Sequence, residues 1–114
     1  MNYKQHKKDL LEGKDVSFCP KGNSMKPKIN SGDKITVSPT DEIKKDDIVF
    51  CKVKGSFYVH LVKAVQGDKY LIGNNKGKTN GWTNKNNIFG KIIKVEKKLN
   101  QSIKTVDIKN RKEK

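Results

Sequence analysis

The sequence predicts a single domain that is mostly β, and three observations lead to this expectation. Its 114 residues allow one domain with little room for a second. From Val16 to Val95, short β-branched and aromatic runs are separated by Gly, Asn, Asp and Pro, a pattern typical of short strands joined by turns. Gly55–Ser56 and Gly67–Asp68 each stand between two such runs, where tight hairpin turns are expected.

The predicted strands follow the apolar runs in chain order: Val16–Cys19, Lys34–Ser38, Asp47–Val53, Phe57–Val65, Tyr70–Ile72 and Ile88–Val95. Residues 16–96 therefore form the predicted β domain. Residues 1–15 are expected to be an arm or a short helix, with Leu10 and Leu11 as their strongly apolar pair and an end at Gly13. Residues 97–114 are a charged tail that is expected to be frayed or weakly helical.

The Asn/Gly-rich stretch Gly73–Asn87 is expected to be a long loop. It contains Trp82, for which two roles remain open: a lid over the open end of the domain, or an exposed aromatic side chain that grips a partner.

Composition excludes several classes of protein. Only 32% of the residues are apolar, which predicts a small core, and no apolar run approaches the roughly 18 residues of a membrane-spanning helix. The basic start lacks the apolar segment of a signal peptide, so a cytoplasmic location is expected. Cys19 and Cys51 supply neither a disulfide framework nor, with two histidines at no recognisable spacing, a zinc site. We expect no metal, no cofactor, and two inert, buried thiols.

The net charge of +14 raises the question of nucleic-acid binding. All but one of the 26 cations are lysines, the exception being Arg111, whereas base recognition relies on the arginine fork. Sequence-specific nucleic-acid recognition is therefore disfavoured. A solubilising surface is the main expectation, and weak, salt-sensitive attraction to polyanions is the alternative.

The segment Gly22-Asn23-Ser24-Met25-Lys26-Pro27 carries the strongest chemical signal. It places a serine in a glycine-preceded turn after a short predicted strand, and its proline prevents a long helix from following. Such a turn can present a hydroxyl group to a cleft. Further along, Gly32–Asp33 and Asp46–Asp47 each lead into an apolar strand. Asp33 and Asp47 are expected to accept backbone hydrogen bonds within their turns.

In this order and at these spacings, the motifs resemble the superfamily of serine peptidases that includes LexA-type repressors and signal peptidases. The resemblance covers about Cys19 to Val95 and includes the strand Tyr58–Val65 and the turn Gly73–Asn75. It implies a small, coiled, partly open β-barrel of the LexA/signal-peptidase catalytic-domain type. It also implies Ser24 as the nucleophile and an oxyanion site and substrate groove beside Asn23 and Met25, with backbone N–H groups around Ser24 and Met25 holding the oxyanion.

The resemblance places the general base on the strand Phe57–Val65, at the position of His60. Lys63 is the rival, since LexA-like enzymes use a lysine, but an odd step along a strand turns the two side chains to opposite faces. Histidine titrates near neutral pH without help, so His60 is favoured.

In histidine-bearing relatives an aspartate orients the base, and here Asn74 stands near that position, with Asp68 as the fallback. The sequence lacks the Ala-Gly and Cys-Gly bonds at which LexA-type repressors cut themselves. The expected activity is therefore hydrolysis of an extended protein or peptide segment of another chain by a Ser24/His60 dyad. The alternative is a non-catalytic binding module of the same fold that holds a protein segment or a polyanion in its groove.

Overall fold

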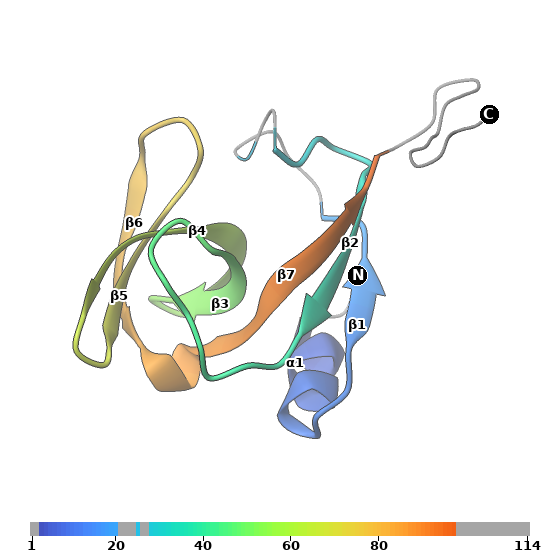
Figure 1. Ribbon diagram of the computed structural model, residues 1–114, viewed down its shortest axis with the longest axis horizontal. Coiled ribbons are helices and arrows are strands. Elements are labelled where there is room, and N and C mark those ends of the chain that lie inside the picture. Colours follow the sequence, from blue (N-terminus) through green and yellow to red (C-terminus); the bar gives the residue numbers. More distant parts are fainter. Residues whose placement is uncertain (1–2, 21–24, 26–27, 98–114) are drawn as a thin grey trace.

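The computed structural model describes residues 3–20, 25 and 28–97, which form one short helix and one antiparallel sheet (Figure 1). The elements are α1 (Tyr3–Leu11), β1 (Val16–Phe18), β2 (Lys34–Ser38), β3 (Ile48–Val53), β4 (Ser56–Gln66), β5 (Lys69–Gly73), β6 (Thr79–Asn84), the 3-10 turn η1 (Lys85–Asn87) and β7 (Ile88–Glu96). This architecture confirms the mostly β prediction with a short N-terminal helix. The predicted tail lies outside the described residues beyond Lys97.

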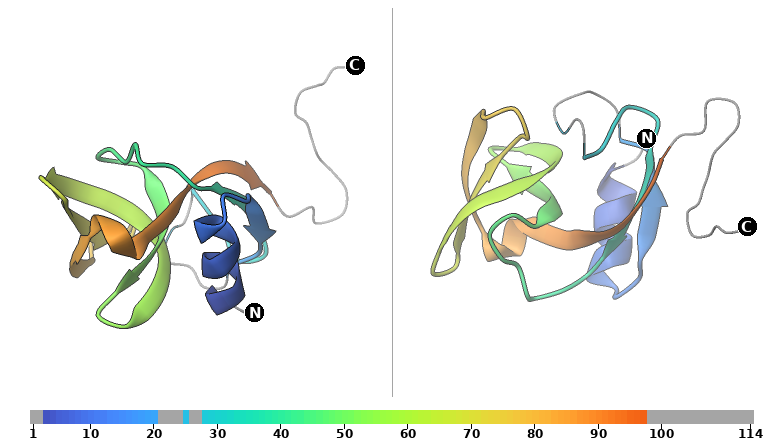
Figure 2. Two further views of the ribbon diagram at one scale, coloured as in Figure 1. Left: turned by 90° about the horizontal axis from the view of Figure 1, so that it is seen from below. Right: turned by 45° about the horizontal axis from the view of Figure 1, so that its top comes forward.

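The sheet has the strand order β1-β2-β7-β3-β4-β5-β6, and β1 and β6 are its two edges, so it is coiled but not closed. Strand β7 joins its two halves, because Val49–Cys51 of β3 pair with its beginning and β2 pairs with its second half. In Figure 1, α1, β1 and β2 lie together at one end of the molecule, and the β5–β6 hairpin lies at the other. Figure 2 shows the same separation from two further directions.

Strand β6 corrects the expectation of a loop between residues 73 and 87. All residues of Thr79–Asn84 except Asn80 pair with β5, and the buried Thr83 hydroxyl donates to the Lys52 carbonyl oxygen at 2.9 Å. Its asparagines and glycine favour turns, so this strand is set by hydrogen bonding to β5 and not by local propensity. Trp82 lies on this strand and is 46% exposed.

Two tight turns lie where hairpins were predicted, but the first, predicted at Gly55–Ser56, is displaced by one residue because Ser56 begins β4. Lys54 and Gly55, both at positive φ, connect β3 to β4, as expected for a two-residue hairpin whose turn matches the twist of the strands. Gly67, also at positive φ, begins the next hairpin turn.

Of the two thiols, Cys51 is buried as expected, and burial raises its pKa to about 12. The expectation that Cys19 is buried is wrong, since this side chain is exposed at the end of β1.

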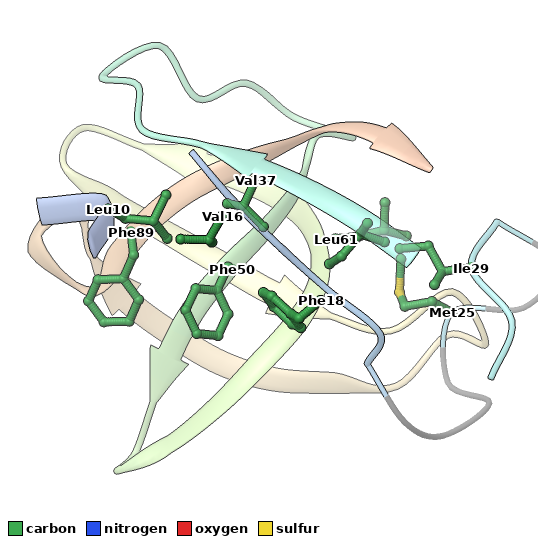
Figure 3. Packing of buried hydrophobic residues seen from close by; sticks show 10 residues of the cluster. Leu10, Val16, Phe18, Met25, Ile29, Val37, Phe50, Leu61 and Phe89 are labelled. Carbon is green, nitrogen blue, oxygen red and sulfur yellow. The ribbon is translucent and has the colours of Figure 1, made fainter. Parts of the chain in front are cut away.

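Two apolar clusters fill the fold. The helix-side core, shown in Figure 3, contains Leu10, Val16, Phe18, Met25, Ile29, Ile35, Val37, Phe50, Leu61 and Phe89. The hairpin-side core contains Ile43, Val49, Cys51, Val53, Val62, Tyr70, Ile72 and Ile88. Strand β3 supplies both clusters, because its alternate side chains point to opposite faces of the sheet.

Adjacent leucines of α1 provide a test of how the helix is attached. Leu10 is 2% exposed in the helix-side core, whereas Leu11 is 67% exposed. We predict that Leu10→Ala lowers the free energy of unfolding by about 2–5 kcal/mol, through lost burial and the cavity left behind. Leu11→Ala is the matched control and should change it by less than about 0.5 kcal/mol. Urea unfolding measures both values, and equal effects would contradict the docking of α1 through Leu10.

Candidate functional site

A cleft of about 380 Å³ opens along one edge of strand β4. Four consecutive β4 residues, Phe57 to His60, line it. Because neighbouring side chains of a strand point to opposite faces, consecutive lining residues indicate that the cleft follows the strand's edge. The described strand pairings place β3 beside Ser56–Val59 but no strand on their other side, since β5 pairs with β4 only from Leu61 onward.

The cleft has two chemically different walls. The apolar wall consists of Tyr3, Met25, Ile29, Phe57 and Val59, which all belong to or pack on the helix-side core. The polar wall consists of Tyr58, His60, Asn74, Lys78 and Asn80. The alternation of side chains along β4 produces this division. Val59 pairs with Phe50 and His60 pairs with Val49, and Phe50 and Val49 point to opposite faces of β3.

His60 is held from two sides in the polar wall. Its side chain is 7% exposed, its ring stacks on Tyr58 with centroids 4.9 Å apart, and its Nδ1 lies 2.6 Å from Asn80 Oδ1. A buried polar ring is costly without a hydrogen-bond partner, so the Asn80 amide stabilises its position as well as its orientation.

The surroundings of His60 favour its neutral form. Burial lowers its pKa below the ordinary value of 6.5, and the positive charge of Lys63 acts in the same direction, while the hydrogen bond to Asn80 opposes them. A lowered pKa favours the unprotonated imidazole at neutral pH, which is the state that a proton acceptor requires.

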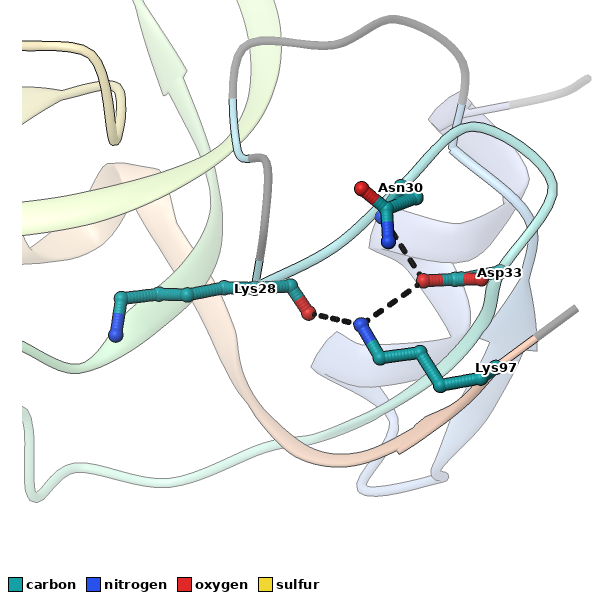
Figure 4. Close-up of polar contacts among 4 residues, drawn as sticks. All are labelled: Lys28, Asn30, Asp33 and Lys97. Atoms are coloured by element: carbon teal, nitrogen blue, oxygen red, sulfur yellow. Dashed lines mark hydrogen bonds and ion pairs between the residues drawn. The ribbon is translucent and has the colours of Figure 1, made fainter. Parts of the chain in front are cut away.

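A polar clamp, made of Lys28, Asn30, Asp33 and Lys97, fixes the segment that follows Met25 (Figure 4). Buried Asp33 accepts through Oδ2 from the Asn30 backbone N–H at 2.9 Å and from Lys97 Nζ at 3.1 Å. Lys97 Nζ also donates to the Lys28 carbonyl oxygen at 2.7 Å.

The clamp is continuous with the apolar wall of the cleft, because the Ile29 N–H donates to the Met25 carbonyl oxygen at 3.0 Å. Asp47, like Asp33, accepts a backbone hydrogen bond within its own turn, from the Lys44 N–H to Oδ2 at 2.8 Å. Both aspartates thus make the backbone hydrogen bonds predicted for them.

The sequence profile of the Peptidase S24-like family matches residues 3–93, which is most of the chain. This chain belongs to the Peptidase S24-like family. The match confirms the resemblance to the LexA/signal-peptidase superfamily. A search of curated proteins gives no match. The helix described by the structure is too short to cross a membrane.

The S24-like pattern predicted six site residues, and the structure describes four of them. Ser24 and Asn23 lie outside the described residues. Met25, which follows Ser24 in the sequence, and His60 line the same cleft, Met25 in its apolar part and His60 in its polar part. Asn74 also lines the cleft, but its side-chain oxygen accepts from the Lys76 and Lys78 N–H groups at 2.8 and 3.0 Å, which shapes the β5–β6 turn.

Asp68 and Lys63 are placed elsewhere in this S24-like domain. Asp68 lies in the β4–β5 turn, just beyond the end of β4 at Gln66. A strand rises about 3.3 Å per residue, so Gln66 is about 20 Å along β4 from His60. Lys63 lines a second, open hollow with Ile43, Lys44, Lys45, Ala64 and Val65, and its side chain lies against Gly73. Neither residue lines the cleft that holds His60.

Asn80 was not predicted from the sequence, although it makes the side-chain contact to His60 Nδ1. Its Asn80-Gly81 pair stands in the stretch expected to be a loop, and such a pair predicts a turn. The register shift between β5 and β6 at this point instead makes it part of a β-bulge.

The clamp leads to a prediction about stability. Lys97→Met should lower the free energy of unfolding by about 1–3 kcal/mol, because the buried carboxylate of Asp33 loses a charged donor. Lys94→Met is the matched control, since Lys94 makes an exposed ion pair with Glu96 at 3.9 Å, and it should change the value by less than about 0.5 kcal/mol. Urea unfolding compares the two variants. If Lys97→Met lowers the free energy of unfolding no more than Lys94→Met does, the clamp does not stabilise the fold.

Proposed function

We propose that this S24-like chain is a serine endopeptidase that hydrolyses peptide bonds of another chain, with Ser24 as nucleophile and His60 as general base. One observation supports this most strongly: Met25, which directly follows Ser24 in the sequence, lines the same cleft as the buried His60, whose pKa is lowered by burial. Lys63 lines a different hollow, which favours the histidine over the lysine as base.

In the proposed reaction, His60 Nε2 takes the hydroxyl proton as Ser24 Oγ bonds to the carbonyl carbon of the substrate. The carbonyl electron pair moves to its oxygen, which is held by backbone N–H groups near Asn23 and Met25. His60 then returns the proton to the leaving amine as the C–N bond breaks. A water molecule, activated by the same ring, hydrolyses the acyl-enzyme.

The open edge of β4 suggests how a substrate binds. We infer that an extended segment aligns beside Ser56–Val59 as an additional strand, with main-chain hydrogen bonds supplying affinity. Alternate substrate side chains would then face the apolar wall and the polar wall. Peptides with an apolar side chain at the positions that face Met25 and Ile29 are the preferred class.

Covalent labelling tests the nucleophile. Wild type should react with a serine-directed fluorophosphonate probe and cleave members of an extended-peptide library, and Ser24→Ala or His60→Ala should abolish both. Ser31→Ala is the matched control, an exposed serine further along the same connection between β1 and β2, and it should retain full labelling. If wild type and Ser24→Ala label equally, the peptidase proposal is wrong, and peptide binding by both would indicate a non-catalytic binding module.

The pH profile tests the base. Because only neutral His60 can accept the proton and its pKa lies below 6.5, the acidic limb of kcat/KM should have its midpoint below 6.5, with activity lost as pH falls through it. His6→Gln, which changes the chain's second histidine, should leave this limb unchanged, and Lys63→Met should retain activity. If the acidic limb of wild type instead has its midpoint in the alkaline range and Lys63→Met loses activity, the lysine is the base.

A further inference from the structure

A β-bulge in the β5–β6 hairpin sets the position of Asn80. Ile72 lies opposite Gly81 and Gly73 lies opposite Thr79, so Asn80 is the extra residue that has no opposite partner on β5. Gly81 adopts a φ of +132°, which side chains rarely allow. Bulges interrupt the regular alternation of a strand and redirect a side chain. Here the redirected side chain is the amide that meets His60.

The hydrogen bond between these side chains specifies the tautomer of the ring. An amide oxygen accepts hydrogen bonds and cannot donate, so Nδ1 must carry the hydrogen in the 2.6 Å contact with Asn80 Oδ1. A neutral imidazole carries one hydrogen on its two nitrogens, which leaves the lone pair on Nε2. Since the ring is also stacked on Tyr58, its rotation is restricted as well.

We propose that Asn80 is the positioning residue of the base: it holds His60 as the Nδ1–H tautomer, with Nε2 as the proton acceptor. This role rests on the proposed peptidase function. When Nε2 takes the Ser24 proton, Nδ1–H continues to donate to Asn80, so the ring need not turn during the reaction. The arrangement is a serine–histidine–asparagine series in which a neutral amide does the orienting.

The groups around His60 are consistent with a neutral side chain, and not a carboxylate, as the group that orients its ring. Lys63 lies on the same strand, and Lys78, Tyr3 and Tyr58 line the cleft. Within the described part of the chain, no carboxylate lines this cleft. The amide dipole therefore orients the ring without raising its pKa as strongly as a carboxylate would.

Nitrogen NMR of the folded protein tests the tautomer without any need for activity. In wild type above its pKa, His60 should show a protonated Nδ1 and an unprotonated Nε2, and the spectrum of His6→Gln assigns the signals because the chain has two histidines. In Asn80→Ala, the preference for this tautomer should fall by about two- to ten-fold, the value of one hydrogen bond. An Nε2–H tautomer in wild type, or an unchanged tautomer in Asn80→Ala, would overturn the proposal.

A second pair of variants keeps the shape of the side chain and changes its charge. Asn80→Asp should raise the pKa of His60 by about one unit or more, because the carboxylate stabilises the imidazolium. Asn84→Asp, the matched control, adds the same charge at an exposed position of the same strand and should raise it far less. Equal shifts in the two variants would show that Asn80 does not contact the ring in solution.

The two proposals fail in different ways. If Asn80 controls the tautomer and pKa of His60 but wild type gives no Ser24-dependent labelling, the positioning role stands and the peptidase function is wrong. If wild type labels at Ser24 and Asn80→Ala changes neither the tautomer nor the acidic limb of kcat/KM, the peptidase stands and the role of Asn80 is rejected.

Discussion

Strand β3 is buried on both of its faces, and the cleft follows from that constraint. Phe50 points into the helix-side core, while Val49 and Cys51 point into the hairpin-side core. Strand β4 pairs with β3 and inherits this division, so neighbouring residues of β4 belong to different environments. Where β5 no longer accompanies β4, the edge of the strand is open, with an apolar wall on one side and a polar wall on the other.

Two buried polar groups in and beside this cleft are stabilised by segments distant in sequence. Asn80 of β6 satisfies the His60 ring, and Lys97, just after β7, pairs with Asp33 after the serine-bearing segment. Buried polar groups cost free energy unless they are hydrogen-bonded, so these contacts both stabilise the fold and define the geometry of the cleft walls. Lys97 lies beyond residues 3–93, to which the family profile extends.

In the proposed mechanism, a histidine held by an amide meets two requirements of a general base: the ring is neutral, and its orientation is fixed. Burial and the nearby Lys63 lower the pKa of His60, which keeps the ring neutral and able to accept a proton. The same surroundings make the imidazolium less stable, and an amide compensates for this less than a carboxylate does. In the role proposed for it, Asn80 orients the ring without reducing the fraction of His60 that is neutral.

The sequence alone determined the mostly β class, most strand positions, the hairpin turns at Gly55 and Gly67, and the family to which the chain belongs, because apolar alternation, turn glycines and the Gly22–Pro27 motif are local signals. Strand β6 and Asn80 were decided by tertiary structure. Thr79–Asn84 has little strand propensity, and pairing with β5 makes it a strand. A bulge then turns one asparagine among many toward His60, and no local pattern distinguishes that asparagine from its neighbours.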